Sequence, residues 1–226
     1  MKFKQYLTEA KINDGEEAID FIKKNCKPYL NDWKKSGTWR SSPYNALYSG
    51  RKSKDSFGSE DIIIKNVRKN RKPKDTSIMK HNYYDLKFEE KFGLKLRSET
   101  VFCVSDTRFA KVYGKPYYIF PIGKYEIYWS PYISDMTMDM TFFYIPGYVD
   151  FDAPLKEIEH EIMTVSDNSY VRLLKDINKD FSRYKKGDLA GAIKSKNEVM
   201  LHTKKVILVQ VDDYYTELIN NMIEEY

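Results

Sequence analysis

Apolar residues recur along this chain at two different spacings, which separate predicted helices from predicted strands. Spacings of three and four residues are typical of a helix with one buried face, and several such segments begin at a residue able to cap a helix. Asp14 precedes the first segment, in which Pro28 predicts a kink or an end, and Ser77 and Gly93 enclose the second. Helices are predicted over 15–30, 77–92, 107–113, 155–163, 170–184, 189–193 and 214–224.

Short runs rich in β-branched and aromatic residues lie between these segments and predict strands. The turn residues Pro121 and Gly123 predict a hairpin between two of them, and residues 37–58 form a loop-rich region with room for one short strand. Helices and strands intermix without regular βαβ alternation, which predicts an α+β fold. The predicted strands cover 62–67, 100–105, 117–120, 125–129, 197–201 and 205–211.

Length and composition fit one compact domain. Of the 226 residues 42% are hydrophobic, enough for one sizeable core but not for two full domains. No apolar run is long enough to cross a bilayer, and the N-terminus lacks the apolar segment of a secretory signal, so no membrane partner is expected. The formal charge of +5 weakly favours an acidic or nucleic-acid partner, although a mildly basic surface explains it more simply.

Cysteine and histidine residues show neither a metal-binding nor a disulfide pattern. Cys26 and Cys103 lie far apart in segments predicted as helix and strand, which favours a reducing compartment. His81, His160 and His202 lack ligand spacing, and each is predicted to be a surface or strand residue. No metal is expected.

Glu198 is the residue whose setting points most directly to chemistry. It enters the apolar strand segment 197–201, where a charge is costly unless it has a function. The alternative is a carboxylate on an edge strand that faces water.

The first ten residues form a short amphipathic segment, with Phe3, Tyr6, Leu7 and Ala10 at helical spacing. This segment resembles the capsid-targeting leaders of internal head proteins in T-even-type phages. In that family a maturation protease cuts after a triplet that corresponds here to residues 7–9. The resemblance implies a leader over 1–10 and a single domain over 11–226; an ordinary N-terminal helix is the alternative.

Three further segments resemble the arginine, serine and glutamate motifs of ADP-ribosyltransferases, in that family's order. They are residues 47–51 (LYSGR), residues 102–105 (FCVS) with 110–114 (AKVYG), and residues 197–201 (NEVML). The resemblance implies split mixed or antiparallel β-sheets flanked by helices, with NAD as substrate.

The resemblance also implies a role for each motif. Cleavage of the bond between nicotinamide and ribose builds an oxocarbenium-like cation, which a carboxylate at Glu198 stabilises. An arginine and a glycine suit a pyrophosphate, a serine binds ribose or braces the glutamate, and an aromatic ring stacks on nicotinamide. The expected catalytic residue is Glu198, and the expected cofactor-binding residues are Tyr48, Gly50, Arg51, Ser105 and Tyr113.

The chain departs from the family pattern at several positions. Ser49 stands where the family has its arginine, and Arg51, two residues on, lies on the same face of a strand as Ser49. Only Ser105 remains of the usual hydroxyl pair, and Lys196 stands two positions before Glu198, where arginine-modifying members often have Glu or Gln. These differences weaken the case for NAD binding and for arginine as the modified side chain. Arg51 in solvent, Ser105 as a cap and Tyr113 in the core are the structural alternatives.

The expected function is therefore that of a bacteriophage NAD-dependent mono-ADP-ribosyltransferase. It would be carried in the virion interior, act in the host cytoplasm and modify a host protein or nucleic acid. The alternative is a non-enzymatic virion or nucleic-acid-binding protein, in which the basic run 68–74 contacts phosphates; this run is otherwise a solvated loop.

Overall fold

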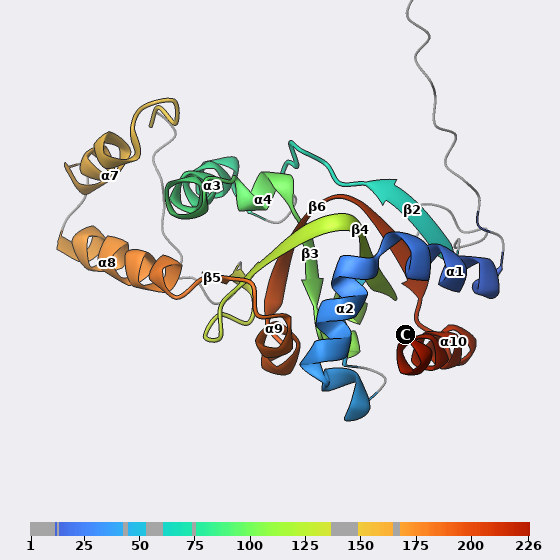
Figure 1. Ribbon diagram of the computed structural model, residues 1–226. Coiled ribbons are helices and arrows are strands. Elements are labelled where there is room, and N and C mark those ends of the chain that lie inside the picture. Colours follow the sequence, from blue (N-terminus) through green and yellow to red (C-terminus); the bar gives the residue numbers. More distant parts are fainter. Residues whose placement is uncertain are drawn as a thin grey trace, which may run out of the picture.

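A computed structural model describes residues 12, 14–42, 45–52, 61–73, 76–136, 149–164 and 168–226 (Figure 1). The predicted leader, residues 1–10, lies outside these ranges, as does residue 74 of the basic run. The helices are α1 (Gly15–Asn25), α2 (Lys27–Ser36), α3 (Ile78–Phe92), α4 (Leu96–Glu99), α5 (Thr107–Val112), α7 (Leu155–Thr164), α8 (Asn168–Ser182), α9 (Leu189–Ser195) and α10 (Asp213–Glu225), with a 3₁₀ turn η1 (Thr38–Arg40). The strands are β1 (Tyr48–Arg51), β2 (Ile62–Asn66), β3 (Val101–Val104), β4 (Lys115–Trp129), β5 (Lys185–Lys186) and β6 (Glu198–Gln210).

Helix ends follow the capping residues of the sequence. The Asp14 carboxylate accepts a hydrogen bond from the Glu17 N–H at 2.7 Å, and the Ser77 hydroxyl accepts one from the Lys80 N–H at 3.2 Å. Gly93 ends α3 in the left-handed conformation, with φ 71°. The helix predicted over 15–30 is interrupted, as Pro28 indicated, although the break lies at Cys26 and not at the proline itself. It is two helices, because α1 ends at Asn25 and Pro28 lies in the first turn of α2, where its missing N–H is tolerated.

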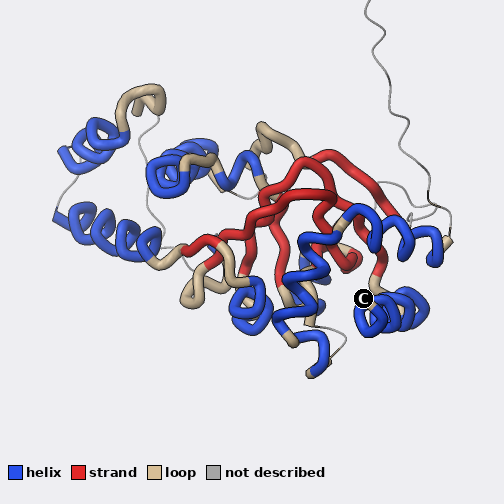
Figure 2. The backbone as a smooth tube through the Cα atoms, in the orientation of Figure 1, coloured by secondary structure: helices blue, strands red, loops and turns tan. Residues whose placement is uncertain are grey.

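The strands form one antiparallel set in the order β2-β6-β3-β1-β4-β5, with a further pairing between β4 and β6 (Figure 2). This confirms the α+β class. The predicted split sheets are joined here, because β4 pairs with β1 and β5, β6 pairs with β2 and β3, and the two long strands pair with each other over 117–129 and 199–210.

The hairpin predicted at Pro121 and Gly123 is wrong, and so is the division of 197–211 into two strands. Residues 115–129 and 198–210 are single strands that pair along most of their length, with a bulge between Ile122 and Tyr125. Pro121 is tolerated because β1 pairs with β4 only as far as Tyr118, so β4 has a strand on one side at that point.

Two apolar cores lie on either side of the sheet. The first packs α1, α2, α9 and α10 against the strands, and the second packs α3, α7 and α8 against Tyr128 and Met200 (Figure 1). Glu198, at the start of β6, is positioned beside the second core by its alternation with Met200.

Candidate active site

Strand pairing brings the three predicted motifs side by side. Val104 at the end of β3 pairs with Tyr48 of β1 on one side and with Glu198 of β6 on the other. This pairing makes the three strands backbone neighbours, but the Tyr48 side chain packs in the first apolar core, whereas Glu198 bonds to Met136 of the second. The order of motifs along the chain therefore corresponds to neighbouring positions in space.

Glu198 is half-buried and held in place by the segment before Met136. Its Oε2 accepts a hydrogen bond from the Met136 N–H at 2.9 Å, and its own N–H donates to the Ser134 carbonyl at 2.9 Å. The next residue, Val199, pairs with strands on both sides, so the alternative of an edge strand facing water is wrong. Glu198 is a positioned carboxylate inside the sheet.

The environment of Glu198 raises its carboxyl pKa from 4.5 to about 7. Burial is the largest cause, because removal from water disfavours the charged form, and Asp135 adds to the rise. The Met136 N–H, Arg97 and Arg71 act in the opposite direction. A carboxyl with a pKa near neutrality in a partly enclosed site is typical of functional groups.

Arg97 is a buried cation near Glu198 that the sequence did not indicate. Its guanidinium donates to the Met136 sulfur at 3.0 Å and lies 5.6 Å from the centre of the Phe102 ring. The same Met136 donates its N–H to Glu198, so one residue contacts both charges. No sequence signal marks Arg97, since it lies in the short helix α4 without a motif.

A polar network fixes α4 against α3. Asp85 accepts hydrogen bonds from the backbone N–H groups of Arg97 at 2.8 Å and Ser98 at 3.2 Å, and His81 lies 3.0 Å from the Ser98 hydroxyl. The prediction that His81 is a surface or strand residue is wrong, because it is buried on α3. Burial lowers its pKa more than the nearby Asp85 raises it. His81 therefore helps to hold α4, and with it Arg97, in position.

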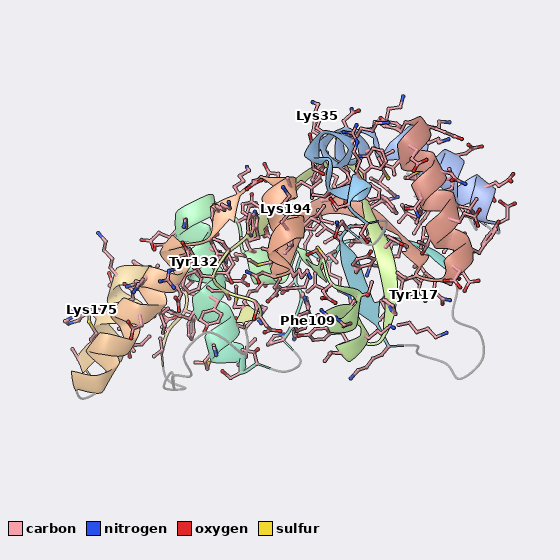
Figure 3. The ribbon with its side chains drawn as sticks, turned by 90° about the horizontal axis from the view of Figure 1, so that it is seen from below. Lys35, Phe109, Tyr117, Tyr132, Lys175 and Lys194 are labelled. Atoms are coloured by element: carbon pink, nitrogen blue, oxygen red, sulfur yellow. The ribbon has the colours of Figure 1, made fainter. Side chains whose placement is uncertain are left out.

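Tyr113 is the predicted aromatic residue that reaches the Glu198 region. It caps the C-terminus of α5, is 48% exposed, and donates its hydroxyl to Asp135 at 2.6 Å. Asp135 precedes Met136, the hydrogen-bond donor to Glu198. The exposed side chains of Phe109 and Val112 continue this surface along α5, and Figure 3 shows Phe109 from below.

Gly50 is required by packing between β1 and α5. A Cβ atom at this position would lie 2.0 Å from the Ala110 carbonyl oxygen and 2.8 Å from the Tyr113 Cβ. The close approach that this glycine permits is therefore to the helix. It places Tyr113 against the arginine motif.

Two other predicted residues are used mainly by the fold. The Ser105 hydroxyl donates to the Ile193 carbonyl at 2.6 Å and so links the end of β3 to α9. This hydroxyl therefore neither caps a helix nor bonds to Glu198. Tyr48 is fully buried and its ring packs on Tyr118, with centroids 5.1 Å apart. Ser49, in place of the family's arginine, is buried as well.

Arg51 and Lys196 lie on the borders of this region. Arg51 ends β1, and its Nη1 is buried without a hydrogen-bond partner in the described part of the chain. Lys196 is the exposed C-cap of α9 with φ 60°, so strand alternation does not place its side chain on the face of Glu198. Of the predicted set, the structure gathers Glu198, Gly50 and Tyr113 most closely.

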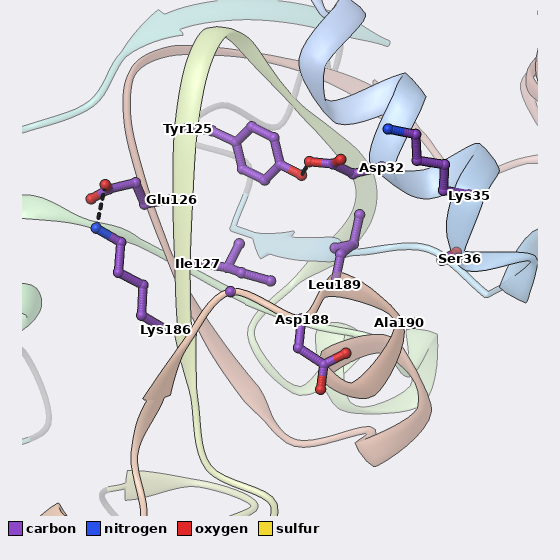
Figure 4. A pocket seen from close by; sticks show the side chains of 11 residues that line it. Asp32, Lys35, Ser36, Tyr125, Glu126, Ile127, Lys186, Asp188, Leu189 and Ala190 are labelled. Carbon is purple, nitrogen blue, oxygen red and sulfur yellow. Dashed lines mark hydrogen bonds and ion pairs between the residues drawn. The ribbon is translucent and has the colours of Figure 1, made fainter.

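A separate cavity of about 550 Å³ opens between β4, α2 and α9 (Figure 4). Several of its polar and charged groups already have partners: Tyr125 donates to Asp32 at 2.6 Å, and Lys186 pairs with Glu126. None of the predicted site residues lines it. The cavity is therefore distinct from the Glu198 region.

Comparison with known proteins adds no assignment. No family model, curated protein or solved structure matches the chain. Within the described ranges, no group of three or more His, Cys, Asp or Glu residues is arranged to hold a metal ion. In the same ranges, no helix has the length and apolar character required to cross a membrane.

Proposed function

We propose that this chain transfers ADP-ribose from NAD to a host macromolecule, with Glu198 as the catalytic carboxylate. One observation carries the proposal: a desolvated, hydrogen-bonded carboxylate stands in register with the arginine and serine motifs, across Val104. Glu198 at this junction matches the requirement of ribosyl transfer for an anionic group beside the sugar.

The low-dielectric setting of Glu198 suits the stabilisation of a cation. When bound, NAD supplies a nicotinamide leaving group and the ribosyl carbon at which the acceptor attacks. Electrostatic attraction to a developing positive charge is stronger where water is excluded, and a positive ligand also favours the ionised carboxylate. Arg97 and Arg71 oppose the rise in the carboxyl pKa, which keeps ionisation accessible near neutral pH.

The residues around Glu198 fit NAD in part. The exposed Tyr113 ring offers a stacking surface, and the buried, unpaired Nη1 of Arg51 suits a phosphate oxygen. Gly50, by contrast, is covered by α5, and Ser105 is bonded to α9. These two contacts favour the second candidate function, a non-enzymatic virion protein that keeps the arrangement without turnover.

Transfer of label from NAD tests the proposal. The protein is incubated with adenylate-labelled NAD and host lysate, beside Glu198→Gln and the matched control Glu157→Gln, which changes an exposed carboxylate on α7. We expect transfer by the wild type and the control, and a loss of at least about a hundredfold in Glu198→Gln. Absence of both transfer and calorimetric NAD binding in the wild type would support the non-enzymatic candidate.

The phage context is a separate part of the proposal. It depends on the resemblance of residues 1–10 to capsid-targeting leaders and implies packaging in the head before action in the host. Mass spectrometry of protein from mature particles tests it. An N-terminus at Ala10 is expected, and an intact Met1 would contradict cleavage.

A further inference from the structure

Basic side chains gather on β1, on β2 and on the linker that follows β2. Lys65 on β2 is the centre of this group. Its pKa is lowered from 10.5 to about 8, first by burial and then by the positive charges of Arg51, Arg68 and Arg71. Four cations from β1, β2 and the following linker therefore lie close enough to act on one another. We call them the basic cluster.

Three of the four cations in the basic cluster lack an ion-pair partner in the described part of the chain. Within the described ranges, Arg51, Lys65 and Arg68 take part in no ion pair, and Nη1 of Arg51 is buried without a hydrogen-bond partner. Buried polar groups normally have partners, and like charges repel most where water is scarce. A bound anion would give the buried Nη1 a hydrogen-bond partner and would reduce the repulsion between the like charges.

Arg71 gives the basic cluster a fixed end. Its backbone N–H donates to the Ser98 carbonyl at 3.1 Å, and its guanidinium stacks on the Phe102 ring at 4.5 Å. Arg71 also acts on the pKa of Glu198, so the cluster extends toward that carboxylate. The exposed Lys69 and Lys72 lie in the same linker.

We propose that Arg51, Lys65, Arg68 and Arg71 bind the phosphate backbone of a nucleic acid. The charge of the cluster favours this ligand over a dinucleotide alone. A pyrophosphate carries about two negative charges, whereas each nucleotide of a strand adds one, so four neighbouring cations can engage several phosphates of a strand. The inference does not depend on ADP-ribosyl transfer.

Salt-dependent binding tests the inference. Fluorescence anisotropy is measured with single-stranded and duplex oligonucleotides of about twenty nucleotides, over a range of salt concentrations. The variant Lys65→Gln/Arg68→Gln removes two charges and leaves Arg51 in place. The control Lys24→Gln/Lys27→Gln removes two exposed charges from α1 and α2. Thermal melting of each variant checks that it folds.

We expect the cluster variant to lower the salt slope by about 1.4 for a single strand, at about 0.7 per phosphate contact, which corresponds to roughly 25-fold weaker binding at about 0.1 M salt. The control is expected to match the wild type. Equal binding by wild type and cluster variant, or an equal loss in the control, would overturn the inference. A third result would also overturn it: the wild type binds NAD but neither oligonucleotide, and the cluster variant loses NAD binding. Oligonucleotide binding without label transfer would leave this inference standing while the proposed enzyme function fails.

Discussion

Replacing Glu198 with glutamine should make the protein more stable at alkaline pH, and by an amount that depends on pH. The folded state raises the carboxyl pKa from 4.5 to about 7. Between these two values the folded protein holds a proton that the unfolded chain releases, so stability falls as pH rises. Above pH 7 the whole penalty is present. At about 1.4 kcal/mol per pKa unit it amounts to about 3 kcal/mol.

Glutamine keeps the shape of the side chain and accepts the Met136 N–H bond, but it cannot ionise. The stability advantage of Glu198→Gln should therefore widen by about 2 kcal/mol between about pH 5.5 and pH 8.5, because about 1.4 kcal/mol of the penalty is already present at the lower value. Urea denaturation at both pH values measures it. The exposed Glu157→Gln control should show a gap that does not change with pH. A Glu198→Gln variant that is less stable at about pH 8.5, or whose advantage is constant, would refute the reasoning.

Three further substitutions test the surroundings of Glu198. Gly50→Ala should lower the free energy of unfolding by about 1–3 kcal/mol, since its Cβ would overlap the Ala110 carbonyl oxygen; an unchanged urea midpoint would contradict this packing. Ser105→Ala should cost about 0.5–1.5 kcal/mol by removing one of the two hydrogen bonds that the Ile193 carbonyl accepts, the other coming from the Lys196 N–H, and a neutral result in thermal melting would argue against the Ser105 bond. Tyr113→Phe should change stability by less than about 1 kcal/mol, because the ring is exposed, yet lower label transfer; full transfer would separate Tyr113 from the site.

Local features of the fold could be predicted from the sequence because their causes are local. Asp14, Ser77 and Gly93 set helix ends through hydrogen bonds or backbone conformation within four residues of themselves. The continuity of β4 could not be predicted, since Pro121 and Gly123 have the chemistry of a turn. Pairing with the long partner β6 converts those residues into part of a bulged strand.

In the candidate site, too, some features could be predicted from the sequence and others depend on tertiary packing. The neighbouring backbone positions of Tyr48, Val104 and Glu198 agree with the order of motifs, which the sequence displays. The uses of Gly50 and Ser105 depend on which helices cover β1 and β3, and no periodicity in either strand reveals that α5 and α9 do so. Arg97 was missed for the same reason, because its proximity to Glu198 exists only after α4 packs beside β6.

Glu198 carries an energetic penalty that its fold does not require. A glutamine fits the same hydrogen bond from Met136, and burial, the largest cause of the raised pKa, acts against the charge alone. Arg97 and Arg71 reduce this penalty without removing it, and neither forms an ion pair with Glu198 in the described structure. The proposed function would account for this penalty, since a cationic ligand lowers the carboxyl pKa and offsets part of the cost on binding. The stability gap of Glu198→Gln therefore measures the cost of the buried negative charge, and the loss of transfer measures the use of that charge in the proposed reaction.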